Sequence, residues 1–284
     1  MILGTMALLA LLASVGICYG TGAFLSLTWL WVLPVGFLGI FLGIGLVGFL
    51  ILWAIVAVVD TDKPQEHDDP FYRRLTGFAV EFVVEALQVR LHPEGMEKLP
   101  KDGRILLVCN HLSLLDPLML LHMFPKTQLA FISKKEVNDM FIVGKLMHRI
   151  MCQLIDREND REALKTILKC IQLLKSDEVS VGVFPEGYTS KDGYLHPFRS
   201  GVFKIAQKAQ VPIVVCTIQG TQHIFHNAIR LRHTDVQLHL VDVMPAPPMR
   251  GVTAVEIGNE VHEKMIGDLG EDKRYVEPET KEDP

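Results

Sequence analysis

The chain has 284 residues and a formal net charge of −5 at pH 7. That length suits one large domain or two small ones, and the lack of a basic footprint excludes nucleic acid as an expected partner. Its five cysteines lie far apart with no C-x-x-C pair, which favours free thiols in a reducing compartment over a disulfide framework.

The N-terminal segment is uncharged: the first Asp, Glu, Lys, Arg or His is Asp60. A helix needs roughly 20 apolar residues to cross the hydrocarbon core of a bilayer. Residues 2–19 supply one marginal span and residues 35–59 a second. We therefore predict a membrane anchor with two transmembrane segments over residues 1–60. The segment between the spans holds potential helix breakers and two interfacial tryptophans: Gly20, Gly22, Pro34, Trp29 and Trp31.

The flanks of the spans predict an orientation. The turn between them has no Lys or Arg, whereas Lys63, Arg73 and Arg74 follow the second span. Because positive residues stay on the cytoplasmic side, we expect an integral membrane protein with its polar domain on the cytoplasmic face. Gly39 and Gly43 form a G-x-x-x-G pattern, which either brings helices close together or reflects the frequency of glycine in membrane helices.

Residues 61–90 are predicted to contain an amphipathic juxtamembrane helix. In the segment 70–89 the apolar side chains fall near one helical stripe, and charged residues lie elsewhere. Two interpretations stay open: a helix lying on a membrane surface, or a helix covering the edge of the next domain. The predicted stripe consists of Phe71, Leu75, Phe78, Phe82 and Val89.

From residue 91 to 270 short apolar strands alternate with helical patterns. This alternation predicts an α/β domain with a mixed, mostly parallel sheet covered by helices. The tail 271–284 has too little apolar content to pack, and we predict that it is disordered. The expected strands are RILLVCN, LAFISK, CQLID, SVGVFPEG, VPIVVCTI and VQLHLVDV, and the expected helices are Phe141–Ile150, Asp160–Lys175, Gly201–Ala209 and Val252–Ile266.

His111 and Asp116 bracket a short loop after the strand that ends at Cys109. Pro117 suits the first position of a helix, so Asp116 is expected just before that helix. A carboxylate bonded to one imidazole nitrogen leaves the other free to take a proton from a hydroxyl. The alternatives are a helix cap at Asp116 and an ordinary polar loop residue at His111. A metal site is not expected, because further ligands are missing.

The pattern N-H-x-S-x-x-D-P resembles the first block of the glycerolipid acyltransferase family, specifically the bacterial-type 1-acylglycerol-3-phosphate (lysophosphatidic acid) acyltransferases. Three further blocks follow in the family's order, so a chance match is improbable. The resemblance covers residues 70–245. The later blocks are KKEVNDMFIVGKLMHRIMCQLIDR, from Lys134 to Arg157; VFPEGYTS, with Phe184, Pro185, Glu186, Gly187 and Ser190; and QVPIVVCTIQG.

The resemblance implies a glycerolphosphate acyltransferase-like fold and acyl transfer from acyl-CoA or acyl carrier protein to the hydroxyl of a lysophospholipid. The acceptor that the resemblance implies is 1-acylglycerol-3-phosphate, and its acylation would give phosphatidic acid in phospholipid biosynthesis. It implies His111 as the catalytic base and Asp116 as its partner, with no metal or cofactor. Backbone N–H groups near Glu186 and Gly187 are candidates for stabilising the oxyanion. The expected substrate-binding residues are Asn110, Ser113, Lys134, Arg157, Glu186, Gly187 and Arg199.

The chain departs from the family in its third block, where Thr189 replaces the Arg expected to bind the acceptor's phosphate. The phosphate would then be bound by Lys134, Arg157, Arg199 or Lys204. Arg199 is the preferred replacement, because it precedes the helix expected from Gly201, whose N-terminus would also attract an anion. An acyltransferase for a different lysolipid or an amine lipid therefore stays open.

Two other enzyme classes remain as alternatives. A membrane-bound thioesterase or lipase would use the same His111–Asp116 pair to activate water. A cysteine enzyme would use Cys109 as its nucleophile, although a cysteine at the end of an apolar strand is usually a small core residue. A serine hydrolase lacks its G-x-S-x-G motif, and a non-catalytic membrane scaffold is disfavoured by the intact His–Asp and P-E-G motifs.

Overall fold

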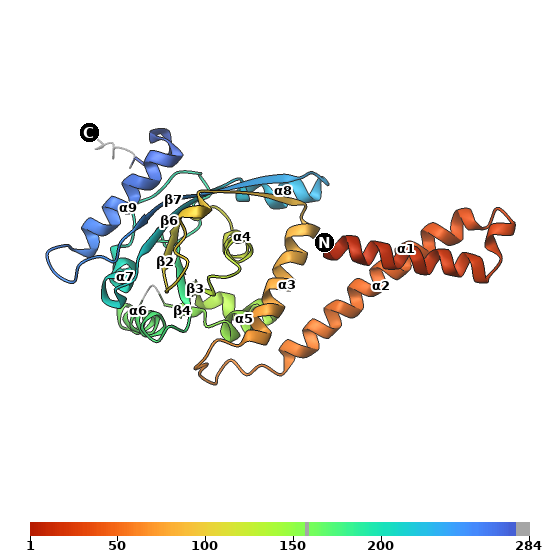
Figure 1. Ribbon diagram of the computed structural model, residues 1–284, viewed down its shortest axis with the longest axis horizontal. Coiled ribbons are helices and arrows are strands. Elements are labelled where there is room, and N and C mark those ends of the chain that lie inside the picture. The colour runs from red at the N-terminus through yellow and green to blue at the C-terminus, as the bar shows by residue number, and fades with distance from the viewer. Residues whose placement is uncertain (157–158, 277–284) are drawn as a thin grey trace, which may run out of the picture.

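The computed structural model describes residues 1–156 and 159–276. An α/β domain forms one part, and a long helical hairpin from the N-terminus projects away from one end of it (Figure 1). Two predictions from the sequence, a mixed sheet domain and an apolar two-helix segment before it, are confirmed.

A seven-stranded sheet runs through the domain in the order β1-β7-β6-β2-β5-β3-β4. Neighbouring strands are parallel throughout except for the antiparallel pair β6 and β7. All six predicted strands are present, and β1 is an addition that was expected to be the end of a helix. The strands are β1 (Val89–Glu94), β2 (Leu106–Cys109), β3 (Leu129–Lys134), β4 (Gln153–Ile155), β5 (Ser180–Val183), β6 (Ile213–Gln219) and β7 (Thr234–Met244).

Both faces of the sheet are covered, as the continuously apolar central strands require. Successive side chains of a strand point to opposite faces. In β2, Leu107 and Cys109 therefore pack toward α3, α4 and α8, while Leu106 and Val108 pack toward α6, α7 and α9. The helices of the domain are α3 (Pro70–Ala86), α4 (Asp116–Met123), α5 (Phe141–Arg149), α6 (Asp160–Lys175), α7 (Phe203–Ala209), α8 (Ile224–Ile229) and α9 (Ala254–Leu269).

Short polar residues start several of these helices, and short 3-10 turns occur between elements along the chain. Asn159 accepts hydrogen bonds from the N–H groups of Arg161 and Glu162, which caps α6. Thr253 and Glu256 cap α9 reciprocally. The 3-10 turns are Ala23–Leu25, Met96–Lys98, Lys135–Asp139, Ser200–Val202, Thr221–His223 and Glu271–Lys273.

The hairpin consists of α1 (Ile2–Gly20) and α2 (Trp29–Ala57), two helices that are long and apolar enough to cross a membrane. Most of their side chains have no covering protein, which distinguishes them from core helices of the domain. The prediction that Pro34 lies outside the second helix is wrong. The helix runs through it, because a proline so near a helix start removes only one hydrogen bond.

The two hairpin helices approach closely at Gly36, where an added Cβ would lie 3.5 Å from Oγ of Ser14. By contrast, a Cβ at Gly39 or Gly43 would meet no atom within 4 Å. The G-x-x-x-G pattern therefore faces away from the partner helix. At the base of the hairpin, the backbone N–H groups of Ile2 and Leu3 donate to the carboxylate of Glu85 in α3.

Helix α3 has two apolar faces instead of one. The face that packs on the domain is formed by Tyr72, Thr76, Val80 and Val84. The predicted stripe supplies the other face, on which Phe71, Phe78 and Phe82 are exposed. The helix also ends at Ala86, so Val89 belongs to β1. One side of α3 thus covers the domain, and the opposite side presents an apolar surface to the outside.

The prediction of a disordered tail is wrong for residues 271–275. Leu195 and Arg274 form a parallel bridge, with hydrogen bonds from the N–H of Leu195 to the carbonyl of Lys273 and from the N–H of Tyr275 to the carbonyl of Leu195. Backbone pairing orders this segment, so its low apolar content is no obstacle. Residues 277–284, the rest of that predicted tail, lie outside the described residues.

Candidate active site

The site forms at the carboxyl ends of the central strands. β2 lies between β6 and β5 in the sheet, and the loop that follows it carries His111. Asp116 is the first residue of α4 instead of the residue before it. The one-residue difference does not alter the prediction that the loop is short enough for the two side chains to meet.

Nδ1 of His111 lies 2.9 Å from Oδ2 of Asp116, and the ring N–H donates to the carboxylate. The same oxygen accepts the backbone N–H groups of Leu112 at 2.7 Å and Ser113 at 2.8 Å. Asp116 is fully buried. Three donors therefore hold one carboxylate oxygen in place, and this oxygen sets the tautomer of His111, leaving Nε2 without a proton in the neutral ring.

The imidazole of His111 is stacked on Phe184, with ring centroids 4.2 Å apart and an angle of 22°. Its side chain is 14% exposed. Within the described parts of the chain, Nε2 has no hydrogen-bond partner. Packing on one face and a carboxylate on one edge leave the other edge of the ring available to an incoming hydroxyl.

Glu186 lies beneath this loop and is 1% exposed. Its Oε1 accepts the backbone N–H of His111 at 3.0 Å. Its Oε2 accepts the hydroxyl of Ser190 and, at 3.1 Å, the N–H of His196. Burial raises the pKa of the Glu186 carboxyl, and these hydrogen bonds partly oppose the shift. Both oxygens are thus engaged by donors of the protein itself, one of which is the backbone N–H of His111.

Gly187 has a φ of +84°, a conformation that glycine adopts without strain. Its N–H donates to the carbonyl of Phe184 at 3.1 Å, so this predicted oxyanion donor is already used in a turn. An added Cβ at Gly187 would lie 2.8 Å from Nε of Arg199. The glycine therefore lets the Arg199 side chain lie directly across the P-E-G turn.

Two of the candidate cations lie near the carboxyl ends of the neighbouring strands β3 and β5. Lys134 is exposed at the end of β3, and Arg199 is exposed beside Gly187. Neither side chain is hydrogen-bonded or ion-paired within the described residues. Lys204 is exposed on α7, while Arg157 lies outside the described residues. The helix expected at Gly201 begins only at Phe203 and has 7 residues, so it adds no anion site.

Asn110 and Ser113, predicted to bind substrate, both make local contacts. The amide of Asn110 donates to the carbonyl of Ile218 at 2.9 Å and accepts its N–H at 2.7 Å, which fastens β2 to β6. The hydroxyl of Ser113 accepts the N–H of Leu115 at 3.3 Å. Each thus supports the shape of the loop that holds His111.

Cys109 is fully buried and pairs in register with Cys216. Burial raises the pKa of its thiol well above the ordinary value. A buried, protonated thiol is a poor nucleophile. The geometry therefore removes the cysteine-enzyme alternative.

Two residues near the site, His196 and Tyr275, were not predicted from the sequence. His196 is buried, stacks on Tyr275 at 4.0 Å, and holds Asp192 through Nε2 at 2.8 Å. The C-terminal segment therefore supports the loop whose backbone binds Glu186. Nothing local in the sequence marks these partners, because residues 196 and 275 meet only in the folded chain.

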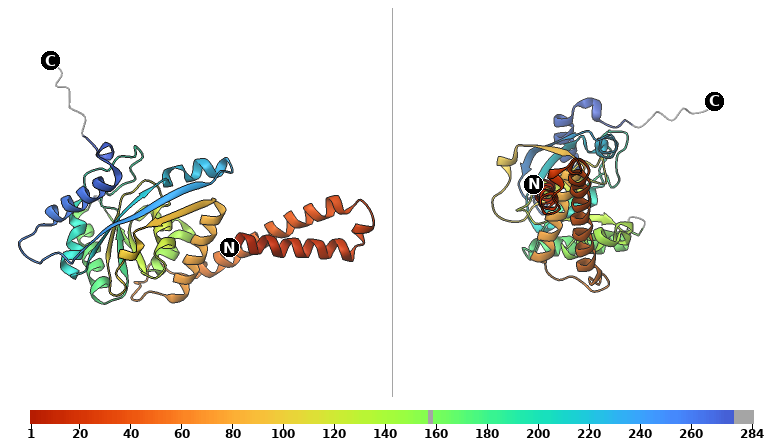
Figure 2. Two further views of the ribbon diagram at one scale, coloured as in Figure 1. Left: turned by 45° about the horizontal axis from the view of Figure 1, so that its top comes forward. Right: turned by 90° about the vertical axis from the view of Figure 1, so that its right-hand side faces the viewer.

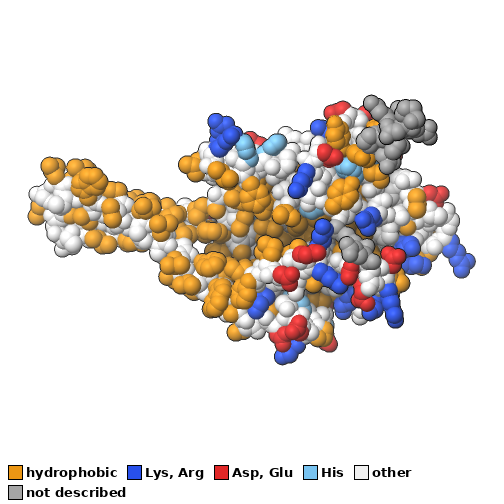
Figure 3. Space-filling view, turned by 180° about the vertical axis from the view of Figure 1, so that it is seen from behind, with side chains coloured by type: hydrophobic (Ala, Val, Ile, Leu, Met, Phe, Trp, Pro, Cys, Tyr) orange, Lys and Arg blue, Asp and Glu red, His pale blue; other side chains and the backbone are white. Residues whose placement is uncertain are grey.

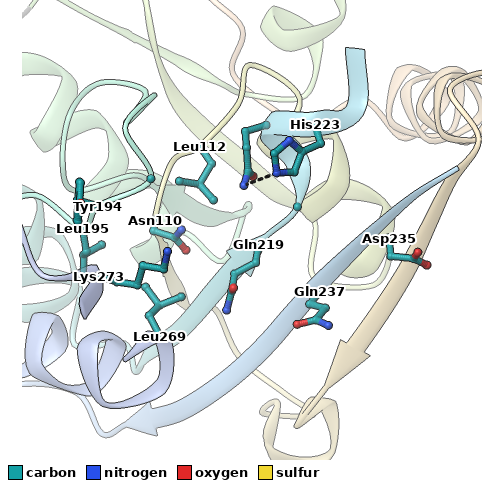
Figure 4. A pocket seen from close by; sticks show the side chains of 13 residues that line it. Asn110, Leu112, Tyr194, Leu195, Gln219, His223, Asp235, Gln237, Leu269 and Lys273 are labelled. Carbon is teal, nitrogen blue, oxygen red and sulfur yellow. Dashed lines mark hydrogen bonds between the residues drawn. The ribbon is translucent and has the colours of Figure 1, made fainter. Parts of the chain in front are cut away.

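A pocket of about 330 Å³ lies on the β6–β7 side of the His111 loop (Figure 4). Asn110 and Leu112 line it on one side, and Gln222 and His223, just before α8, line it on another. The lining mixes polar side chains, such as Gln219 and Gln237, with apolar ones, such as Leu195 and Leu269.

Residues 90–219 match the family described as "Acyltransferase". A probable 1-acyl-sn-glycerol-3-phosphate acyltransferase of Mycoplasma pneumoniae is 37% identical over 145 residues, which are 50% of this chain and 53% of that protein. The human 1-acyl-sn-glycerol-3-phosphate acyltransferase alpha is 30% identical over 169 residues, 60% of this chain and 59% of its own. The chain thus spans about half the length of these curated relatives.

Among solved structures, the 1-acyl-sn-glycerophosphate (LPA) acyltransferase PlsC from Thermotoga maritima shares the fold. The TM-score is 0.58 at 24% identity, over 72% of this chain and 81% of that one. The matched sequence region contains the His111 loop and the P-E-G turn. Residues 90–219 are thus similar to the Acyltransferase family in sequence, and the chain shares its fold with the Thermotoga maritima protein.

Proposed function

We propose that this protein transfers a fatty acyl group from a thioester donor, acyl-CoA or acyl carrier protein, to the hydroxyl of a lysophospholipid. The observation that carries the proposal is the His111–Asp116 pair, with one imidazole nitrogen bound to a buried carboxylate and the other available. Relatives named as 1-acyl-sn-glycerol-3-phosphate acyltransferases support the same reaction class.

In the proposed reaction Nε2 of His111 removes the proton from the acceptor hydroxyl as that oxygen attacks the thioester carbonyl. Asp116 stabilises the resulting imidazolium by accepting a hydrogen bond from Nδ1–H, and the proton stays on the ring. Collapse of the tetrahedral intermediate breaks the C–S bond, and His111 returns its proton to the departing thiolate. The products are a diacyl lipid and the free thiol of the donor, and the base is regenerated.

For the acceptor we propose 1-acylglycerol-3-phosphate, so that the product is phosphatidic acid. Thr189 stands where the family's phosphate-binding Arg is expected, but the guanidinium of Arg199 lies against Gly187 in the same turn. Arg can bind a phosphate through two parallel N–H bonds. Arg199, helped by Lys134 at the neighbouring strand end, would replace the missing side chain.

We further propose that residues 1–60 anchor the enzyme in a bilayer, with the domain of residues 91–270 on the cytoplasmic side. The helices of the hairpin have 19 and 29 residues, or about 28 and 43 Å at 1.5 Å per residue. Both ends of the hairpin lie at the domain. A reporter placed after Pro284 should be accessible from the cytosol, and one near Gly22 from the other side.

The catalytic proposal is tested with purified protein in lipid vesicles, a panel of lysolipids and both donors. His111→Ala removes the base and should lower the rate of transfer by about 10²–10⁴-fold. Asp116→Asn should also lower it strongly, whereas Cys109→Ala should retain most activity. Release of free fatty acid at the same rate without any acceptor would instead show the thioesterase alternative. Equal rates with phosphate-free and phosphate-bearing lysolipids would show a different acceptor.

A further inference from the structure

We propose that α8 and the three residues after it form a second contact with an anionic lipid surface, separate from the hairpin. We call Phe225, Ile229, Arg230, Leu231 and Arg232 the α8 patch. The inference rests on the proposed membrane location of this protein, but not on its catalytic mechanism.

The apolar members of the α8 patch are unusually exposed. Phe225 is 53% exposed, Ile229 85% and Leu231 80%, although they lie within seven residues of one another. Only Ile224 of this helix is buried and fixes it to the domain. Leu231 also has a φ of +54°, a conformation that is costly for a bulky side chain. Isolated exposed apolar residues are common, but a cluster of this kind marks an interaction surface.

The α8 patch lies at the end of the domain from which the hairpin projects. Helices α3 and α8 stand at that end in two views, while α6, α7 and α9 lie toward the opposite end (Figures 1 and 2). In the space-filling view, apolar side chains extend from the hairpin onto this end of the domain (Figure 3). The exposed face of α3, with Phe71 and Phe78, adds to the same apolar end.

Charge favours a bilayer over a protein partner. Arg230 and Arg232 are exposed, and no carboxylate pairs with either within the described residues. The side chain of Arg230 is hydrogen-bonded to the ring of His226. Apolar side chains interspersed with arginines suit a membrane interface, where the apolar groups enter the acyl boundary and the cations meet anionic headgroups. The five residues of the α8 patch include no acidic side chain that could pair with these arginines across a contact between two copies.

The location also gives the α8 patch a role in substrate entry. α8 follows β6, the strand beside β2, and Gln222 and His223 at its start line the pocket that Leu112 borders. In the His111 loop itself, Leu114 is 75% exposed. A contact at α8 would hold this edge of the sheet against the lipid surface, where the acceptor resides, instead of letting it pivot on the hairpin.

Fluorescence depth measurements test the proposal on the full chain in phosphatidylglycerol-containing vesicles. The native cysteines are all buried, so Ile229→Cys can be labelled selectively with an environment-sensitive dye. Brominated acyl chains should quench the dye at residue 229 but not at the control Lys208→Cys, exposed on α7. An unquenched dye at residue 229 in active protein would overturn the proposal, whereas quenching in a protein without transferase activity would reject only the proposed reaction.

A kinetic comparison gives a second, independent readout. The triple variant Phe225→Ser, Ile229→Ser, Leu231→Ser should raise the KM for vesicle-embedded acceptor by about tenfold or more. Its kcat with a short-chain, water-soluble acceptor should stay unchanged. Leu164→Ser with Leu168→Ser, exposed on α6, is the matched control. Conversion of a wild-type oligomer into a monomer by the triple variant would show a contact between copies and overturn the proposal.

Discussion

The buried carboxylate of Glu186 accepts the backbone N–H of His111 at 3.0 Å. Two motifs that lie 75 residues apart are thereby joined at the position that carries the proposed base. The other oxygen of Glu186 binds Ser190 and the N–H of His196. One side chain thus ties the His111 loop to the segment that follows the P-E-G turn.

Glu186→Gln should lower kcat by about ten- to a hundredfold, because hydrogen bonds to a charged group contribute about 1.5–3 kcal/mol. The amide can accept on only one side, so either His111 or the Ser190–His196 side loses its acceptor. The KM of the thioester donor should change little. Steady-state kinetics check this, with Ser190→Ala as a milder control; a KM effect alone would show that Glu186 binds substrate directly.

The same variant has an expected pH signature. Burial raises the folded-state pKa of Glu186 above its ordinary value of 4.5. The folded protein therefore holds this proton at pH values where the unfolded chain has lost it, and the contribution to stability falls as pH rises from about 4.5 through the raised pKa. The melting temperature of wild type minus that of Glu186→Gln should decrease over that window. A difference independent of pH would contradict this assignment.

Gly187→Ala should raise the acceptor KM and lower the melting temperature. An alanine there pays roughly 1–2 kcal/mol for its left-handed backbone and also displaces Arg199, since its Cβ would lie 2.8 Å from Nε. Gly251→Ala is the matched control, because φ is +86° there and nothing lies within 4 Å. Equal kinetic effects of the two substitutions would exclude a specific role for the Gly187–Arg199 contact.

Arg199→Ala should raise the KM for lysophosphatidic acid by about ten- to a hundredfold, the cost of a charge-assisted hydrogen bond. The KM of the donor and activity on a phosphate-free lysolipid should remain near wild type. Lys208→Ala, another exposed cation close in sequence, serves as the control. If Arg199→Ala affects both acceptors equally, the side chain supports the turn and does not bind phosphate.

Tyr275→Ala should loosen the segment around His196 and lower activity several-fold, because it removes a ring stacked at 4.0 Å. Aromatic pairs contribute about 0.5–1.5 kcal/mol beyond their buried area. Faster tryptic cleavage at Lys191 and Arg199 would report the loosening, and Tyr275→Phe should restore both properties. Cleavage at the wild-type rate in Tyr275→Ala would show that backbone pairing of Leu195 alone orders this segment.

Several features of this protein follow from the sequence by itself. Residues 1–59 carry no charged side chain and contain two apolar runs long enough to cross a bilayer as helices, so the two helices of the hairpin were predictable. The strand ending at Cys109 and the Pro after Asp116 together predict a short loop, and the structure brings His111 and Asp116 within 2.9 Å. These are local relationships, in which the period of the side chains and the backbone limits of proline act over a few residues.

Only the tertiary structure decided the features that depend on contacts between distant segments. The role of Glu186, the order of residues 271–275 and the burial of Cys109 each depend on partners far away in the chain. Likewise, amphipathic spacing predicted one apolar stripe on α3 but could not show that this stripe, with Phe71 and Phe78, stays exposed while Val80 and Val84 pack on the domain. The hydrophobic effect is non-directional, so it does not by itself select which apolar face is buried. The shape of the assembled sheet and helices determined which apolar side chains remain exposed.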